Sequence, residues 1–114
     1  MNVISTSTKL RAADQRSDLL FAKQAADVSR VMNLLGNENR LLILCHLMMR
    51  KEMKVGDIVD AVKLSQSALS QHLAKLRDEG LVTTRREAQS IFYSIADPKA
   101  SRLLAVLHEL YCRR

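Results

Sequence analysis

Apolar positions between residues 64 and 82 recur at the spacing of one helix face: they are Ala68, Leu69, Leu73 and Leu76. The opposite face carries hydroxyl, amide and basic side chains, namely Gln66, Ser67, Ser70, Gln71, Lys75 and Arg77. Such side chains hydrogen-bond base edges and phosphates when a helix lies in the major groove of DNA. An ordinary surface helix, the alternative, usually has more Glu and Lys. The pattern therefore favours a DNA-reading helix, which we expect to end at Gly80.

Three further helices are predicted ahead of this one. Residues 16–35 have a broad apolar face, and residues 38–50 are apolar nearly all round and are expected to be buried. Residues 55–62 form a short helix with Val and Ile inward. Asn37 and Ser65 are the expected N-caps of the helices that follow them.

Two strand-like runs follow Gly80. Residues 81–86 and 90–96 are predicted strands, residues 87–89 the tip of their hairpin, and residues 50–54 a charged turn earlier in the chain. Asp97 and Pro98 are typical of a helix start, so the last helix runs from there to the end of the chain. The predicted fold is mainly α with a β-hairpin wing: a winged helix-turn-helix of order α-α-α-α-β-β-α.

The chain has 114 residues, of which 47% are hydrophobic, and this suits one small domain. Residues 1–15 are polar and are expected to form a flexible tail, with the DNA-binding and dimerisation domain at 16–114. The first and last helices have no place in a minimal winged helix, yet both have apolar faces. We therefore expect a homodimer that pairs through its N- and C-terminal helices.

The net charge of +6 favours a polyanionic partner such as double-stranded DNA, although the basic residues are not gathered in one block. No apolar run approaches the roughly 18 residues that cross a membrane, and the first residues have no signal-peptide core. The expected location is the cytoplasm. Nothing resembles a nucleophile elbow or an oxyanion loop, so an enzyme is not expected.

Taken together, several segments resemble the ArsR/SmtB repressors, and the resemblance covers about residues 20–112. They are Asn39–Leu44, Val55–Ile58, Leu64–Leu73, Leu76–Val82 and Ile91–Ile95. The resemblance implies a homodimeric winged-helix repressor that an inducer releases from its operator, with the terminal helices at the dimer interface. The operator of such a dimer is expected to be an inverted repeat, since two recognition helices enter successive major grooves.

The metal sites for which this family is best known are absent from the sequence. Where one site has a Cys-Val-Cys, this chain has Lys54, Val55 and Gly56. Where another begins Asp-x-His, this chain has Lys99, a cation that repels a metal, and only His108 lies farther along. No metal and no other cofactor is therefore expected, although a repressor released by a metal at an unfamiliar site stays an alternative.

Two cysteines remain, Cys45 and Cys112, 67 positions apart. Their placement resembles the thiol-sensing branch of the family, the BigR, SqrR and HlyU type. That resemblance implies that persulfides or other oxidants join the two as a disulfide or a longer sulfur bridge, and that the bridge lowers DNA affinity. The alternative is structural, because free cysteine often serves as a small buried hydrophobe. A regulator relieved by a competing protein, without thiol sensing, is also consistent with the sequence.

The candidate DNA contacts fall into three groups. The expected base contacts are Ser67, Ser70, Gln71 and His72, and the expected phosphate contacts are Gln66, Lys75 and Arg77, beside the N-cap Ser65. In the wing, Arg85 or Arg86 is expected to enter a minor groove or touch a phosphate. A protein-interaction module with no DNA role is the alternative from another class, and a salt titration of DNA binding separates the two.

Overall fold

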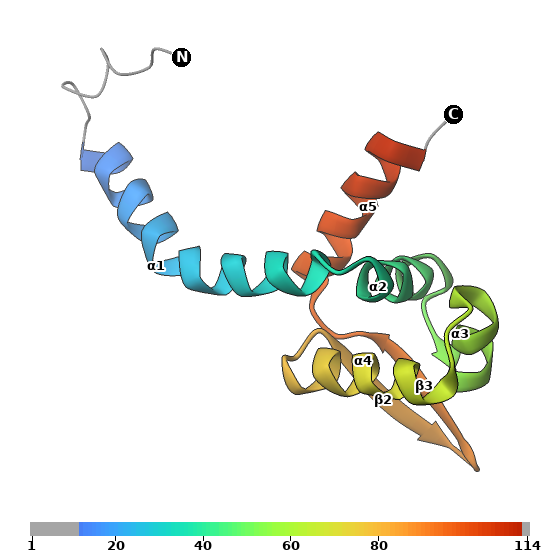
Figure 1. Cartoon of the computed structure of the whole chain (residues 1–114). Coiled ribbons are helices and arrows are strands. Elements are labelled where there is room, and N and C mark those ends of the chain that lie inside the picture. Colours follow the sequence, from blue (N-terminus) through green and yellow to red (C-terminus); the bar gives the residue numbers. More distant parts are fainter. Residues whose placement is uncertain (1–11, 113–114) are drawn as a thin grey trace. The chain divides into compact units, whose positions relative to one another are not determined.

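The computed structural model describes residues 12–112, with side chains from residue 15 onward. Its elements are α1 (Ala12–Leu35), α2 (Glu38–Arg50), β1 (Met53–Lys54), α3 (Val55–Val62), α4 (Gln66–Asp78), β2 (Val82–Glu87), β3 (Ser90–Ile95) and α5 (Pro98–Cys112). The predicted order of helices and hairpin is confirmed, with one strand added (Figure 1).

Two expectations about the N-terminal region need correction. Helix α1 begins at Ala12, so it takes in residues that were assigned to the flexible tail; residues 1–11 lie outside the described part. The chain also forms two compact units, with the boundary between Asn33 and Leu34, instead of a single domain from residue 16. Residues 12–33 of α1 belong to the first unit, and the side chains from residue 15 to residue 29 are all exposed.

Within the second unit, α2 is the central helix. It packs against α3, α4, α5 and β3, and in Figure 1 it lies between α4 and α5. Its residues Ile43, Leu44 and Leu47 belong to the buried core, which also includes Leu69 of α4 and has no aromatic side chain. No polar side chain is buried in the part of the chain that the structure describes. This core fixes the position of the elements that carry the candidate site.

The expectation that α2 is buried nearly all round is wrong. Leu42 and Met49, which lie two turns apart, are 40% and 48% exposed. The helix buries one face because its neighbours within the second unit cover only that side.

The expected charged turn at residues 50–54 contains a strand. Met53 and Lys54 form β1, which pairs antiparallel with Tyr93 and Phe92 of β3. The sheet therefore has three strands in the order β1-β3-β2, where the sequence predicted a two-stranded wing. The hairpin is present, but its predicted tip at residues 87–89 is one residue too long, because Glu87 is the last residue of β2 and pairs with Ser90.

Helix starts follow the predicted capping. The Asn37 side chain accepts a hydrogen bond from the Arg40 backbone N–H at 3.0 Å, and the Asp97 carboxylate accepts one from the Lys99 backbone N–H at 2.9 Å. Each satisfies a backbone donor that the first turn of a helix leaves without a partner. The caps fix where α2 and α5 begin, and so the positions of the cysteines that these helices carry.

Candidate nucleic-acid interface and cysteine pair

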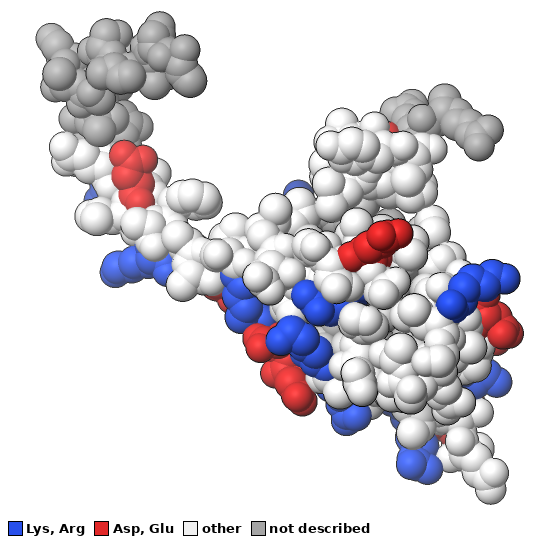
Figure 2. Space-filling view, viewed as in Figure 1, with Lys and Arg blue, Asp and Glu red and all other residues white. Residues whose placement is uncertain are grey.

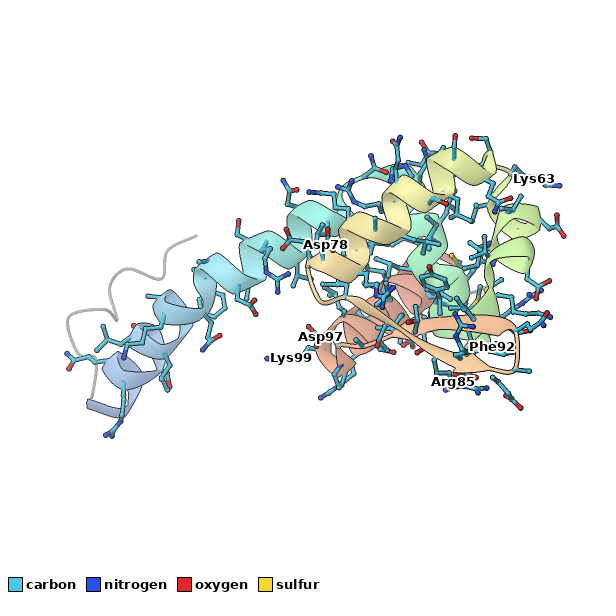
Figure 3. All side chains as sticks on the ribbon, turned by 90° about the horizontal axis from the view of Figure 1, so that it is seen from below. Lys63, Asp78, Arg85, Phe92, Asp97 and Lys99 are labelled. Carbon is cyan, nitrogen blue, oxygen red and sulfur yellow. The ribbon has the colours of Figure 1, made fainter. Side chains whose placement is uncertain are left out.

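The turn between α3 and α4 is built from two capping features. Lys63 ends α3 in the left-handed conformation, with φ 61° and ψ 36°, and its backbone N–H donates to the Val59 carbonyl. Ser65 then caps α4, because its hydroxyl accepts a hydrogen bond from the Ala68 backbone N–H at 3.1 Å. The two helices and this short turn form a helix-turn-helix, and Figure 3 shows α4 running from the turn beside Lys63 to Asp78.

The packing of α4 determines which side chains it presents to solvent. Leu69, Leu73 and Leu76 are at most 2% exposed and hold one face of the helix on the core. The predicted contact residues Ser65, Gln66, Ser67, Ser70, Gln71, Lys75 and Arg77 are all exposed, and His72 is half-buried. The structure thus brings the hydroxyl, amide and basic groups together on the outer side of α4. That arrangement suits hydrogen bonding to base edges and phosphates.

The two wing arginines have different surroundings. Arg85 donates from Nε and Nη2 to the two carboxylate oxygens of Glu52, at 2.7 and 2.9 Å, and from Nη1 to Glu87 at 2.9 Å. Its guanidinium carbon lies 4.6 Å from the centre of the Phe92 ring (Figure 3). The hydrogen bonds from Arg85 hold the pKa of the Glu52 carboxyl below its usual value and raise that of Arg85 itself.

Arg86 is the next residue of β2 and therefore points to the other face of the hairpin. It lines a shallow pocket between the wing and α4, whose walls are Arg77, Thr84, Arg85, Arg86, Ile91 and Tyr93. Among the described residues, none accepts a hydrogen bond from Arg86. Arg77 and Arg86 thus bring two positive charges to one concave surface. The sequence named both arginines but gave no sign that they meet, since they come from different elements.

Charge is distributed unevenly over the second unit. Figure 2 shows blue and red side chains around α4 and the wing, whereas the visible part of α5 is largely white. Val106, Leu110 and Tyr111 are the large exposed hydrophobic residues of α5, at 51%, 70% and 82%.

Residues 12–112 contain no group of three or more His, Cys, Asp or Glu arranged to hold a metal. No helix within these residues is long and apolar enough to cross a membrane.

The two cysteines lie on helices that pack together, α2 and α5. Cys45 is half-buried, Cys112 is exposed, and neither is in a disulfide. Burial raises the pKa of the Cys45 thiol, and negative charge on Cys112 raises it further. The fold therefore places the two cysteines on helices that pack together, although 67 positions of sequence separate them.

Comparison with known proteins decides the family. Residues 37–84 match the family model described as "Bacterial regulatory protein, arsR family". The chain is 44% identical over 91 residues to the transcriptional activator HlyU of Vibrio cholerae, a match that spans 80% of this chain and 83% of that protein. The protein belongs to the ArsR family. It is a transcriptional regulator that binds DNA, and the relatives it matches are regulators and not enzymes.

Solved structures of ArsR-family regulators agree with the fold. The crystal structure of the transcriptional repressor BigR from Xylella fastidiosa superposes with a TM-score of 0.76 at 33% identity, covering 87% of this chain and 98% of that one. A homodimeric winged helix-turn-helix DNA-binding domain from Mycobacterium bovis gives a TM-score of 0.66 at 33% identity, covering 85% and 84% of the two chains. The predicted winged helix-turn-helix is confirmed by these neighbours.

Some residues of the site were not foreseen. Glu52, Glu87 and Phe92 surround Arg85, and none of them belonged to the predicted interface. Only the Phe92 contact had a signal in the sequence, because residues paired across a hairpin share a face and Arg85 pairs with Phe92. Glu52 lies 33 positions from Arg85, and only the added strand brings the two together.

Proposed function

We propose that the protein is a homodimeric repressor whose two α4 helices bind an inverted-repeat operator. The exposed polar face of α4 carries this proposal, because its Ser and Gln side chains are the groups that read base edges. Ser67, Ser70, Gln71 and His72 are the proposed base contacts. The proposed phosphate contacts are Gln66, Lys75, Arg77 and Arg86, with the cap Ser65 fixing the helix start.

The proposed dimer forms through the terminal helices. In α5, Leu110 and Tyr111 expose apolar surface that a monomer leaves in water. In α1, Leu19, Leu20 and Phe21 are 64%, 57% and 67% exposed. A second copy of the chain supplies matching apolar surface to both, and the homodimeric relative supports this arrangement.

We further propose that Cys45 and Cys112 control DNA binding. The exposed Cys112 thiolate attacks the outer sulfur of a persulfide R–S–SH, so that Cys112 becomes a persulfide and RS⁻ leaves. The Cys45 thiolate then attacks the Sγ atom of Cys112, forms the Cys45–Cys112 disulfide and expels HS⁻. The persulfide is the oxidant, and the two thiols are oxidised. Cys112 is placed first because it is exposed, whereas Cys45 is half-buried and its pKa is raised.

The disulfide acts on DNA binding through the packing of α2. This helix packs against α5 and also against α3, α4 and β3. A bond that brings the Cα atoms of the two cysteines within about 7 Å constrains the angle between α2 and α5. The position of α4 over the groove then changes with it. The proposed compartment is the bacterial cytoplasm, where the DNA lies and where thiols begin reduced.

The decisive experiment combines mass spectrometry with DNA binding. The reduced protein selects a duplex from a randomised library, and its affinity for that duplex is measured over a salt series before and after treatment with a persulfide donor. We expect steep salt dependence, a Cys45–Cys112 crosslink in the treated protein and loss of binding in proportion to the crosslink. Cys45→Ser and Cys112→Ser are the matched controls, and both are expected to keep binding after treatment. Release from DNA with both thiols unchanged overturns the thiol switch and leaves the DNA-binding role in place.

A further inference from the structure

Arg85 is held more firmly than any other exposed cation that the structure describes. Each of its three guanidinium nitrogens donates to a carboxylate, two of them to Glu52 as a bidentate pair. The same planar fork is the part of an arginine that matches a phosphate. With Glu52 in the fork and the Phe92 ring 4.6 Å away, Arg85 has a protein partner where a DNA contact needs an open donor face.

The strand geometry separates Arg85 from Arg86. In β2 successive side chains point to opposite faces, and each pairs with a residue of β3: Arg85 with Phe92, and Arg86 with Ile91. Thr84, Arg86, Ile91 and Tyr93, which share one face of the hairpin, line the pocket beside Arg77 of α4. Arg85 also contributes to the pocket wall, but its guanidinium donates to Glu52 and lies over Phe92, which does not line the pocket. Arg86 therefore faces the side of the wing where α4 presents its own cation, and the guanidinium of Arg85 lies over the other face.

Glu52 is held in place by a strained turn. Lys51 has φ 75° and ψ −52°, and the backbone N–H of Glu52 donates to the Arg50 carbonyl at 2.9 Å, which closes a γ-turn. This conformation is costly for a residue with a side chain and persists where the surroundings fix it. One residue later the chain enters β1, where Lys54 pairs with Phe92. Backbone pairing and the Arg85 ion pair thus attach the hairpin to the end of α2 at the same place.

We propose that Arg85 is a positioning residue. Glu52 and Phe92 hold it on the face of the hairpin away from Arg86, and this contact fixes the wing so that Arg86 reaches the phosphate backbone. The inference rests on the proposed DNA-binding function and assigns different roles to the two wing arginines. It also gives Glu52, an acidic residue, a favourable effect on binding to a polyanion.

The test compares variants by the salt dependence of DNA binding, which counts phosphate contacts. Binding is measured over a salt series on a duplex of mixed sequence and on the duplex that the parent protein selects. The variants are Arg85→Gln, Arg85→Lys, Arg86→Gln and Glu52→Gln. Asp60→Asn is the control, because it removes the same charge from an exposed position of α3. Thermal unfolding by circular dichroism checks that each variant is folded.

We expect Arg86→Gln to reduce the slope of log affinity against log salt by about one per protomer. Arg85→Gln is expected to weaken binding roughly 3- to 10-fold with the slope unchanged. Arg85→Lys keeps the charge but loses the fork, so it should behave like Arg85→Gln. Glu52→Gln should weaken binding to the same extent, although it removes a negative charge, whereas Asp60→Asn should not weaken it.

Two results would contradict the role proposed for Arg85. If Arg85→Gln reduces the slope as Arg86→Gln does, or if Glu52→Gln strengthens binding beyond Asp60→Asn, then Arg85 is a phosphate contact that Glu52 masks, and the proposal is wrong. Failure of the proposed function itself looks different. In that case the parent protein binds neither duplex in a salt-dependent way, and both proposals are overturned together.

Discussion

Helices α4 and α5 have similar lengths, 13 and 15 residues, but present opposite kinds of surface. Both bury a narrow apolar face, with Leu69 and Leu76 in α4 and Leu104 in α5 fully buried. Apart from two alanines, the rest of α4 is polar, whereas α5 leaves Leu110 and Tyr111 largely in water. The difference indicates the chemistry of the partner: a polar helix face suits a hydrated polyanion, and an apolar one suits another protein surface.

The largest expected effect comes from placing a charge on the apolar surface of α5. Leu110→Asp buries an unpaired carboxylate in the proposed interface and removes apolar contact area, so the dimer dissociation constant should rise by roughly 100-fold or more. Sedimentation velocity over a concentration series measures it. Folding of the monomer should be preserved, because Leu110 is 70% exposed.

The matched control for Leu110→Asp lies on α4. Ala74 is exposed there, and Ala74→Asp should leave the dimer intact while it weakens DNA binding through repulsion from phosphate. If Leu110→Asp sediments as the parent protein does at every concentration, α5 is not part of a dimer interface. The contrast between the two helices would then need another explanation.

The next effect separates two roles within α4. Gln71→Ala should cost about 1–3 kcal/mol on the selected duplex and little on mixed-sequence DNA, because an amide that reads a base edge contributes only where that base is present. Gln66→Ala should weaken both duplexes alike, as expected for a phosphate contact. Fluorescence anisotropy with both duplexes measures the four affinities. An equal loss on both duplexes for Gln71→Ala would rule out its base-reading role.

The α2–α5 pair allows a test by pH. An aromatic disulfide such as Ellman's reagent should first form a mixed disulfide at the exposed Cys112 and release one thiolate. The Cys45 thiolate then attacks Sγ of Cys112 and releases the second. Because the pKa of Cys45 is raised, its thiolate is a minor form at neutral pH. The second release should accelerate about tenfold per pH unit through the neutral range.

Stopped-flow absorbance resolves the two releases. Cys45→Ser is the control and should release one equivalent only. If the rate of the second release does not depend on pH, disulfide closure does not wait for deprotonation of Cys45, and the prediction is wrong. The absence of a second release would show that the two sulfur atoms do not reach each other.

The sequence predicted the parts of this molecule that depend on neighbouring residues. Ser65 and Asn37 cap the helices they precede because a cap needs only the next three residues. The leucines of α4 lie on the core because their spacing is that of a helix face. The polar face of α4 follows from the same periodicity, so the proposed base contacts could be named before the structure.

The sequence did not predict the features that depend on distant residues. Strand β1 has two residues, too few for a periodic pattern, and it exists because β3 offers an unpaired edge about 40 positions later. The Arg85–Glu52 ion pair depends on that strand. The exposed side of α2 was missed for a related reason: an apolar run does not show which side its neighbours cover.

A smaller effect separates folding from DNA contact at the start of α4. Ser65→Ala removes the hydrogen bond to the Ala68 backbone N–H, so the free energy of unfolding should fall by about 1 kcal/mol. Ser67→Ala, two residues later, should leave stability nearly unchanged and weaken binding to the selected duplex. Urea denaturation and anisotropy measure the two quantities. Loss of stability in both variants, or in neither, would contradict the assignment of Ser65 as the cap.

The smallest effect tests backbone conformation on either side of α4, at Lys63 before the helix and at Gly80 after it. Lys63 has φ 61° and ψ 36°, a conformation that costs a side-chain-bearing residue about 1–2 kcal/mol. Lys63→Gly should raise the free energy of unfolding by about 0.5 kcal/mol, since the extra freedom of glycine in the unfolded chain offsets part of the relief.

Gly80, just beyond α4, provides the reverse substitution. Its φ is 82°, and a Cβ added there meets no atom within 4 Å, so Gly80→Ala measures the backbone cost without a steric clash. It should lower stability where Lys63→Gly raises it. The surface that α4 presents to DNA is unchanged by Gly80→Ala, so affinity for DNA should follow the folded fraction alone. A change in affinity beyond that fraction would show that the turn after α4 sets the position of the wing against the reading helix.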